Sequence, residues 1–369
     1  MQVWARGPRL KPRLGTTAEA ALPVYGQTPS RGFSRALEGV MNRRGFIGTI
    51  GAGLGSVFVP CLPKWRTDHA LVERWSWVMG QPVHVIVFAA SEQEGLDACA
   101  AALAELRRVE SRLTLFDEAS DLCELNRRAG RKRMRVDEDL RLILAQAAAF
   151  KRATGGAFDV AVEPLMRVWG FHRHRVTAPT ATELAQAREA VLAAVVELDG
   201  DVAQCPSAHT QLDFGAIGVG YGIDRALELL RGRGLRRAFI DVSGDMAAIG
   251  APPGEPGWLV EIADPDRPGG RTVAATRLWD AALATAANTE SIVRYGSVVA
   301  GHVMDPATGW PARALRQASV VTRTAVAADA LSTAMLVTGR RPAGVLKAYS
   351  VQQVIPGLAP GVSRDSGAN

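Results

Sequence analysis

Hydrophobic residues recur along this chain at two spacings, and the two alternate irregularly. Apolar residues every three to four positions predict five helices, whereas short runs rich in apolar and β-branched residues predict five strands. The predicted helices are residues 95–115, 140–154, 182–195, 224–232 and 325–338. The predicted strands are residues 77–89, 237–242, 258–263, 272–278 and 318–322. Because these elements do not follow a strict β-α-β order, we expect an α+β fold in one domain spanning residues 67–355.

The net charge of +6 is unevenly distributed over the 369 residues. Residues 1–66 hold ten Lys or Arg and two acidic residues, a local charge of +8, so the remainder of the chain is at −2. The basic character belongs to the N-terminal segment and does not indicate nucleic-acid binding by the folded part. The four cysteines lack CxxC or zinc-ligand spacing, which argues against a metal site built from thiolates.

The N-terminal segment resembles an export signal. Asn42-Arg43-Arg44-Gly45-Phe46-Ile47 places an arginine pair before a Gly-rich apolar run that ends at Val59, as in twin-arginine signals. The run is too short and too rich in glycine to span a bilayer as a stable helix. We expect a signal at residues 41–66, a misassigned or disordered extension at 1–40, and a polar tail at 356–369. Export by this route predicts a periplasmic or otherwise extracytoplasmic protein, with membrane association left open.

A histidine, a carboxylate and a hydroxyl fall within seven residues in the segment Gly301-His302-Val303-Met304-Asp305-Pro306-Ala307-Thr308-Gly309. Pro306 fixes one backbone angle and Gly309 permits positive φ, so the segment is predicted to be a defined turn. Such a turn would present the polar groups from fixed positions.

A second glycine-rich segment runs from Leu212 to Asp224 as LDFGAIGVGYGID. Its four glycines predict a turn that leads into a helix, where backbone amides face an anion such as phosphate. The spacing does not fit G-x-G-x-x-G, which excludes the dinucleotide-binding motif. Asp213 and Asp224 bracket the turn, and we expect one of them to hold a ligand and the other to hold a helix.

Asp329 and Thr333 lie four residues apart on the last predicted helix and therefore share a face. The neighbouring residues are apolar, which predicts a buried helix on which an unpaired carboxylate is costly. A carboxylate with a hydroxyl is an oxygen-only donor set, which suits a hard cation such as Mg²⁺.

Three more segments leave a structural and a functional interpretation open. Residues 111–126 could line a ligand ring, or form a helix-to-helix loop with Ser120 as N-cap. Gly155-Gly156 could let the backbone that leads to Asp159 approach a ligand closely. Asp245 could face the same pocket or cap a turn.

Taken in order, these segments resemble the ApbE family, the FAD:protein FMN transferases. The resemblance covers residues 75–345. It rests on Met79-Gly80, residues 114–126, Gly156-Ala157-Phe158-Asp159, Trp169-Gly170-Phe171, Asp213 to Asp224, Ser243-Gly244-Asp245, His302-x-x-Asp305-Pro306-x-Thr308-Gly309 and Ala328-Asp329-Ala330-x-x-Thr333. Each motif is weak alone, but their common order is specific. The resemblance implies an α+β architecture of the T-fold type, with mixed or antiparallel sheets packed against helices.

The resemblance also implies an activity and a set of site residues. Family members use Mg²⁺ to cleave FAD between its phosphates, move FMN onto a Thr or Ser hydroxyl of a target protein and release AMP. The implied Mg²⁺ ligands are Asp329, Thr333 and the backbone carbonyl of Ala216. The implied FAD contacts are Met79, Phe116, Ala157, Phe158, Asp159, Asp213 and Val219, with His302 and Asp305 at the reacting phosphates. The acceptor would be a membrane-associated electron-transfer protein carrying a Thr/Ser flavinylation motif, and the base acting on its hydroxyl would be His302 or an aspartate near the metal.

The chain departs from the family pattern at three places. Val219 stands where Lys or an acidic residue is usual, and Ser243 replaces a glycine. Ala286-Ala287-Asn288-Thr289 replaces a Thr-Ser-Gly segment. These departures leave two alternative functions open: a flavin-binding carrier without catalysis, and a Mg²⁺-dependent FAD pyrophosphatase that hands FMN to water.

Overall fold

The computed structural model describes residues 69–265, 272–289, 291–341 and 343–356. The expected extension and export signal lie outside these residues, as does the expected tail beyond Pro356. The largest element of the described structure is a seven-stranded sheet. Its strands follow the order β1-β2-β6-β7-β10-β13-β14, and every neighbouring pair is antiparallel. The strands are β1 (Ala70–Val78), β2 (Gln81–Ala89), β6 (Ala238–Val242), β7 (Asp245–Ile249), β10 (Ala282–Ala287), β13 (Gln317–Thr322) and β14 (Gln353–Pro356).

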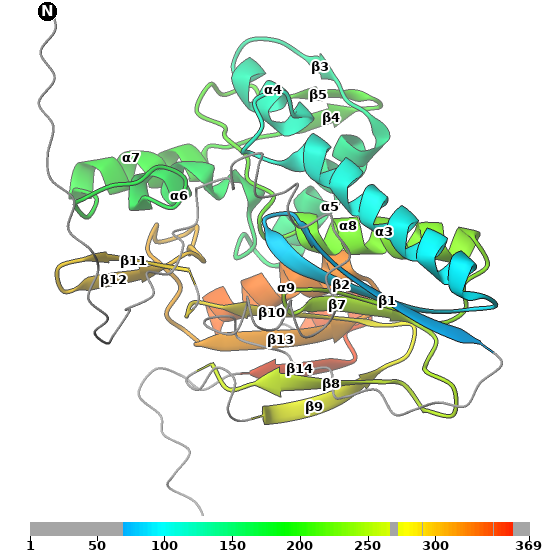
Figure 1. Ribbon diagram of the computed structural model, residues 1–369. Helices are drawn as coiled ribbons and strands as arrows, with labels where there is room; N and C mark the ends of the chain where they lie inside the picture. Colours follow the sequence, from blue (N-terminus) through cyan, green and yellow to red (C-terminus); the bar gives the residue numbers. More distant parts are fainter. Residues whose placement is uncertain (1–68, 266–271, 290, 342, 357–369) are drawn as a thin grey trace, which may run out of the picture.

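Both faces of the large sheet are covered (Figure 1). Helices α3 (Glu92–Leu113), α8 (Gly218–Gly232) and α9 (Ala325–Thr338) pack on one face, and the hairpin of β8 (Trp258–Ala263) and β9 (Thr272–Leu278) packs on the other. Side chains of β2 alternate between these layers. Val85 and Val87 join the core beneath the helices, whereas Ile86 and Phe88 join the core around Trp258. The expected α+β class with antiparallel sheets is therefore confirmed.

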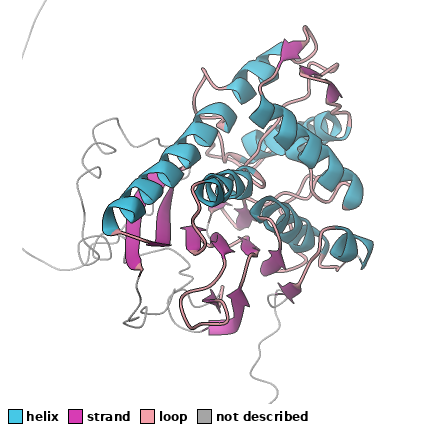
Figure 2. Ribbon diagram, turned by 90° about the vertical axis from the view of Figure 1, so that its right-hand side faces the viewer, coloured by secondary structure: helices cyan, strands magenta, loops and turns pink. Residues whose placement is uncertain are grey.

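Smaller elements build the region beside this sandwich. Helix α5 (Glu138–Ala153) joins the helical layer, and Figure 2 shows the helices gathered above the strands of the sheet. The remaining helices are α4 (Asp121–Arg128), η1 (Val160–Val162), α6 (Glu163–Trp169), α7 (Ala181–Leu192) and α10 (Ala343–Ala348). Two small sheets complete the fold: β3-β5-β4 (Met134–Arg135, Val202–Gln204, Glu197–Asp199) and the hairpin of β11 (Ile292–Tyr295) with β12 (Val298–Gly301). None of the described helices is long and apolar enough to cross a membrane.

The single strand expected at residues 77–89 is wrong. The chain turns at Met79 and Gly80, whose φ angles are 56° and 68°, so β1 and β2 form a hairpin. Methionine rarely adopts positive φ, and no sequence pattern indicates a turn at such a residue. The hairpin places Met79 at the end of the sheet closest to α8, where its methyl group lies against Gly222.

The turn expected before Asp224 is also partly wrong, because α8 already begins at Gly218. Its glycines are accommodated by packing: a Cβ at Gly220 would overlap the Ala325 carbonyl at the start of α9, and one at Gly222 would overlap Met79. Gly220 therefore brings α8 and α9 into backbone contact, and Gly222 makes room for Met79. Only the residues before Gly218 remain a loop.

Candidate functional site

The contact between α8 and α9 positions Asp329. Its Oδ2 accepts a hydrogen bond from the Gly220 amide at 3.1 Å, and the side chain is buried. In a continuous helix the Gly220 amide would instead bond to the Ala216 carbonyl, four residues earlier. No described residue donates a hydrogen bond to that carbonyl. At the start of α8 the Gly220 amide thus bonds to a buried carboxylate in place of the Ala216 carbonyl.

The donor set at this place suits a hard cation. Burial, together with the nearby Asp224 carboxylate, raises the pKa of Asp329 to about 7. A bound cation would favour the ionised form and offset that cost. No cluster of three or more His, Cys, Asp or Glu side chains with metal-binding geometry occurs among the described residues. The donors available are one carboxylate, the half-buried Thr333 hydroxyl and the Ala216 carbonyl, and all of them are oxygen.

Asp224 holds a helix, as expected for one of the two aspartates that bracket this segment. Its carboxylate accepts hydrogen bonds from the amides of Ala325 at 2.8 Å and Val326 at 2.9 Å. These amides belong to the first turn of α9. The side chain of the N-cap residue Thr324 makes no hydrogen bond to that turn, so Asp224 takes over the capping role. Burial raises the pKa of Asp224 to about 6. Asp224 therefore fixes α9, and with it Asp329, relative to α8.

Asp213 is paired with a histidine that sequence reasoning missed. The Nε2 atom of His172 lies 3.2 Å from Asp213 Oδ2, and its Nδ1 lies 3.9 Å from Glu163 Oε1. Burial alone would lower the pKa of His172, but the two carboxylates outweigh it and raise the pKa to about 9. Burial of Asp213 is likewise outweighed by His172 and the Gly215 amide, which hold its pKa below the usual value. The pair is ionised at neutral pH.

The surroundings of this pair are built by residues far apart in the chain. Asn126 clamps the Leu212 backbone through bonds of 2.9 and 2.8 Å, and the Asp213 amide donates to the Val160 carbonyl at 2.7 Å. Phe116, which is half exposed, meets the His172 ring edge-on at 6.1 Å. The sequence predicts that residues 111–126 either line a ligand ring or form a helix-to-helix loop with Ser120 as N-cap. The second prediction is confirmed for Ser120, which caps α4.

His302 is half-buried within its predicted turn. Burial of the ring lowers its pKa, and the hydrogen bond to the Ser291 backbone and the negative charge of Asp213 offset this only in part. Its Nδ1 is buried without a hydrogen-bond partner among the described residues. At neutral pH the ring is therefore uncharged, with a nitrogen available for a proton or a ligand.

Asp305 organises the turn that carries His302. One of its oxygens accepts the Ala307 amide and the other accepts the Thr308 hydroxyl, both at 2.9 Å. The turn is anchored from outside by Trp169, whose Nε1 donates to the Gly309 carbonyl at 2.9 Å. Because both oxygens are used inside the turn, the contact expected between Asp305 and the reacting phosphates stays a prediction.

The unusual segment 286–289 supports the same turn. The Asn288 side chain accepts the Val303 amide at 2.8 Å and donates to the Ala312 carbonyl at 2.9 Å, so it clamps both sides of the loop. A Cβ on Gly301 would overlap Asn288, which shows how closely the two segments approach. Asn288 therefore serves as a backbone clamp for His302.

The remaining predicted contacts differ in accessibility. The side chains of Phe158 and Val219 are buried in hydrophobic cores, and the Phe158 amide donates to the Thr154 hydroxyl at 3.1 Å. Asp159 caps Ala161 at 2.9 Å and pairs with Lys151 at 2.7 Å. Ala157 is half-buried. Asp245 accepts the Thr285 amide of the neighbouring strand at 3.3 Å, a structural contact that its two interpretations did not include.

Replacing His172 with glutamine is expected to lower the free energy of unfolding by about 2 kcal/mol near pH 6, because a charged hydrogen bond to Asp213 is lost. A pKa raised from 6.5 to about 9 means that this contribution is complete below pH 6.5 and is lost as the pH rises through 9. Urea denaturation of both proteins over this range measures the difference. A difference that does not shrink at alkaline pH would contradict the ion pair.

Known proteins resemble this chain in sequence and in fold. The FAD:protein FMN transferase of Treponema pallidum is 31% identical over 250 residues, which are 63% of this chain and 69% of that protein. The protein of the same name from Haemophilus influenzae is 26% identical over 244 residues, 63% of this chain and 70% of that protein. The crystal structure of the ApbE protein from Thermotoga maritima matches with a TM-score of 0.68 at 25% identity, covering 78% of this chain and 97% of that one.

A second solved structure, the flavin transferase ApbE from Vibrio cholerae, has the same fold at a TM-score of 0.67 and 22% identity, covering 78% of this chain and 93% of that one. The family model described as the ApbE family matches residues 79–354, which include Met79, the His172–Asp213 pair, His302 and Asp329. The chain belongs to the ApbE family.

Proposed function

We propose that this protein is an FAD:protein FMN transferase that depends on Mg²⁺, attaches FMN to a Thr or Ser side chain of an acceptor protein and releases AMP. The names of its relatives support the transferase activity. The observation that carries the proposal is the uncharged His302 ring with its unpartnered Nδ1, in a fold that also holds the oxygen donors around Asp329. A proton acceptor and a cation site are the two parts that phosphoryl transfer to a hydroxyl requires.

The proposed reaction exchanges one phosphorus–oxygen bond for another. The acceptor hydroxyl oxygen bonds to the phosphorus of the FMN half of FAD, the bond from that phosphorus to the bridging oxygen breaks, and AMP leaves with that oxygen. The hydroxyl proton passes to His302 Nδ1, which is free to take it. Mg²⁺, held by Asp329, Thr333 and the Ala216 carbonyl, would supply positive charge to the phosphates.

The chain's other residues position these groups. The Asn288 clamp and the Asp305 turn hold His302. Asp224 holds Asp329 through α9. Phe116, exposed beside His172, offers an aromatic face to a flavin or adenine ring. We further propose that the acceptor is a membrane-associated electron-transfer protein and that transfer takes place outside the cytoplasm.

The test is a reaction of the full chain with FAD, Mg²⁺ and a panel of candidate acceptor domains encoded near it. Intact-protein mass spectrometry detects attached FMN, and chromatography detects AMP and free FMN. Transfer predicts attached FMN together with AMP. Free FMN and AMP without a modified protein would instead establish a pyrophosphatase, and bound FAD that stays intact would establish a carrier.

A further inference from the structure

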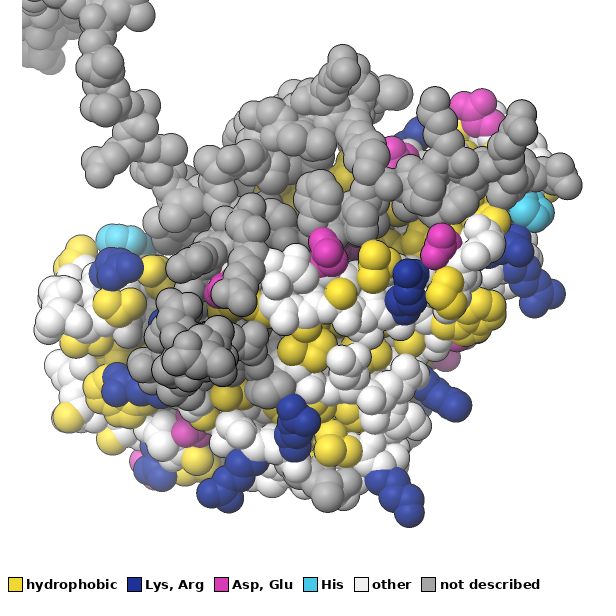
Figure 3. Space-filling model, turned by 90° about the horizontal axis from the view of Figure 1, so that it is seen from below, with side chains coloured by type: hydrophobic (Ala, Val, Ile, Leu, Met, Phe, Trp, Pro, Cys, Tyr) yellow, Lys and Arg dark blue, Asp and Glu magenta, His cyan; other side chains and the backbone are white. Residues whose placement is uncertain are grey.

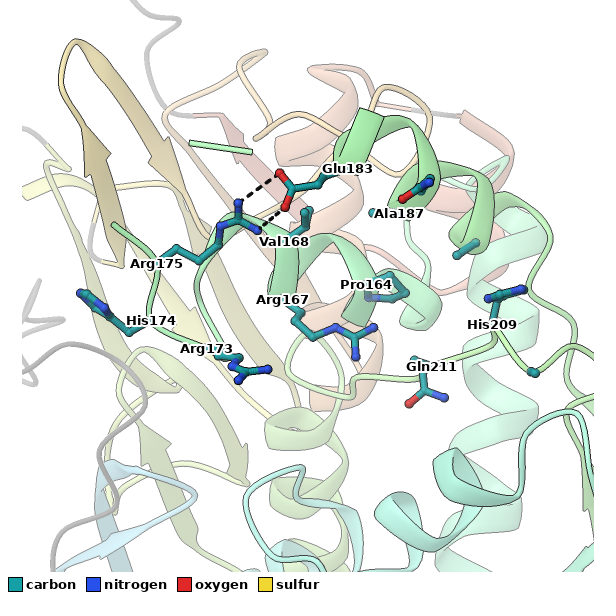
Figure 4. Close-up of a pocket in the computed structure, with 13 residues that line it drawn as sticks. Pro164, Arg167, Val168, Arg173, His174, Arg175, Glu183, Ala187, His209 and Gln211 are labelled. Atoms are coloured by element: carbon teal, nitrogen blue, oxygen red, sulfur yellow. Dashed lines mark hydrogen bonds and ion pairs between the residues drawn. The ribbon is translucent and has the colours of Figure 1, made fainter. Parts of the chain in front are cut away.

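A basic groove, separate from the residues assigned to FAD or metal, lies between α6, α7 and residues 207–211, with a volume of about 720 Å³. It is lined by Pro164, Arg167, Val168, Arg173, His174, Arg175, Glu183, Gln186, Ala187, Ala190, Ala208, His209 and Gln211. Figure 4 shows Arg173 and Arg167 on one side of the opening, with Gln211 and His209 on the other. Its volume is within the range of ligand-binding pockets.

The groove concentrates positive charge in a part of the chain that is otherwise slightly acidic. Three arginines line it against a single carboxylate, Glu183, and two histidine rings complete the polar lining. That carboxylate is already used, because it bonds to Arg175 at 3.0 and 3.1 Å and to the Thr180 amide at 2.8 Å. Arg167 lies 3.4 Å from Glu163, so Arg173 is the lining arginine that has no ion pair among the described residues. By contrast, the basic side chains visible in Figure 3 are dispersed over their face.

The groove adjoins the candidate site through two chain segments. Arg173 directly follows His172, and Gln211 lies two residues before Asp213. His172 and Asp213 are themselves joined by their ion pair at 3.2 Å. The groove and the His172–Asp213 pair are therefore linked by residues 172–173 and 211–213.

The lining suits a peptide better than a nucleotide. It contains no Phe, Tyr or Trp on which a base could stack. Two of the amides at the start of α7, those of Thr180 and Glu183, are bonded within the capping box, which leaves fewer donors there for a phosphate. Three alanines add small apolar surface to the lining. The Gln186 amide and the side-chain carbonyl oxygen of Gln211, whose own NH2 group is bonded to Asn126 and Thr210, can bond to an extended backbone.

From this charge and shape we propose that the groove binds an acidic segment of the acceptor protein and thereby guides its hydroxyl toward the candidate site. The inference rests on the proposed function. It assigns the groove as a surface that contacts the acceptor protein. Charge complementarity at such a surface steers association and fixes the register of the bound partner.

The test uses the full chain and a fluorescent decapeptide of alternating glutamate and alanine. The double variant Arg173→Glu, His209→Glu removes the Arg173 cation and places a carboxylate on both sides of the groove without touching Asp213, His302 or Asp329. Fluorescence anisotropy should show about a tenfold weaker peptide affinity for this variant, and a weaker salt dependence, because one attracting cation is lost and two carboxylates that repel the peptide are introduced. Arg233→Glu is the matched control: it reverses the charge of an exposed arginine just beyond the end of α8, and the variant should bind the peptide like the wild type.

Other results would overturn the proposal. These are equal peptide affinity in all three proteins, no binding to the wild type at low salt, or displacement of the peptide by AMP with loss of AMP binding in the double variant. The last result would make the groove a nucleotide site. FAD affinity, measured by flavin fluorescence, should be the same in all three proteins. Because neither readout needs turnover, the outcome is independent of whether FMN transfer occurs.

Discussion

Replacing Asp329 with alanine is expected to abolish FMN transfer, with a loss of at least about a thousandfold, because a bound cation supplies several kcal/mol of charge stabilisation to the phosphates. Asp329 is the only carboxylate in the implied metal set, whose other members are a hydroxyl and a carbonyl. Without it, those two neutral oxygens cannot hold a divalent cation. The rate of AMP release in the presence of Mg²⁺, with FAD and acceptor saturating, measures the effect.

The structure also provides a variant that separates chemistry from folding. Asp329→Asn keeps the side-chain volume and an oxygen that can accept the Gly220 amide. Burial already disfavours the charged carboxylate, so the neutral amide is tolerated in the core. Asp329→Asn should therefore unfold at the same urea concentration as the metal-free wild type and yet be inactive. Thr338→Ala, near the end of the same helix, is the matched control and should stay active. Wild-type activity in Asp329→Asn would refute the metal assignment.

The second large effect is expected at His302. His302→Gln should lower the rate of transfer by about a hundredfold to ten-thousandfold, the usual contribution of a positioned base. FAD affinity should change little, because the ring contributes a proton acceptor rather than charge. The ordinary pKa of histidine is 6.5, and burial lowers it here. The wild-type rate should therefore rise with pH through a pKa below 6.5 and then level off.

The same pH profile distinguishes a base from a structural residue. If His302 takes the proton, the acid limb of the profile disappears in His302→Gln. If His302 only supports the turn, the rate falls equally at every pH and the limb remains. An acid limb retained in the variant would move the role of base to an aspartate near the metal.

Periodicity was sufficient to predict the five long helices and the α+β class, because each element buries a regular apolar stripe. It did not reveal the β1–β2 hairpin, whose turn depends on a methionine at positive φ. Strand β10 was also missed, because Ala282–Ala287 is mostly alanine and has little strand preference of its own. This strand lies between β7 and β13, so pairing on both sides determines its conformation.

The residues of the candidate site likewise fall into those that the sequence predicts and those that only the fold reveals. Asp329 with Thr333, and the turn around His302, are local patterns and could be found in the sequence. His172 could not, because its pKa and its role depend on Asp213 and Glu163, which only the fold brings to it. Asn288 is a comparable case: the sequence shows a departure from the family pattern, whereas the structure shows a clamp on the His302 turn.

The measurement that tests the central claim most directly is the ratio of AMP released to FMN covalently attached, followed over time in one reaction with Mg²⁺ and acceptor. Direct transfer predicts equal amounts of both at every time point, with no free FMN. AMP in excess of attached FMN, accompanied by free FMN, would contradict transfer to protein, and so would attached flavin without AMP.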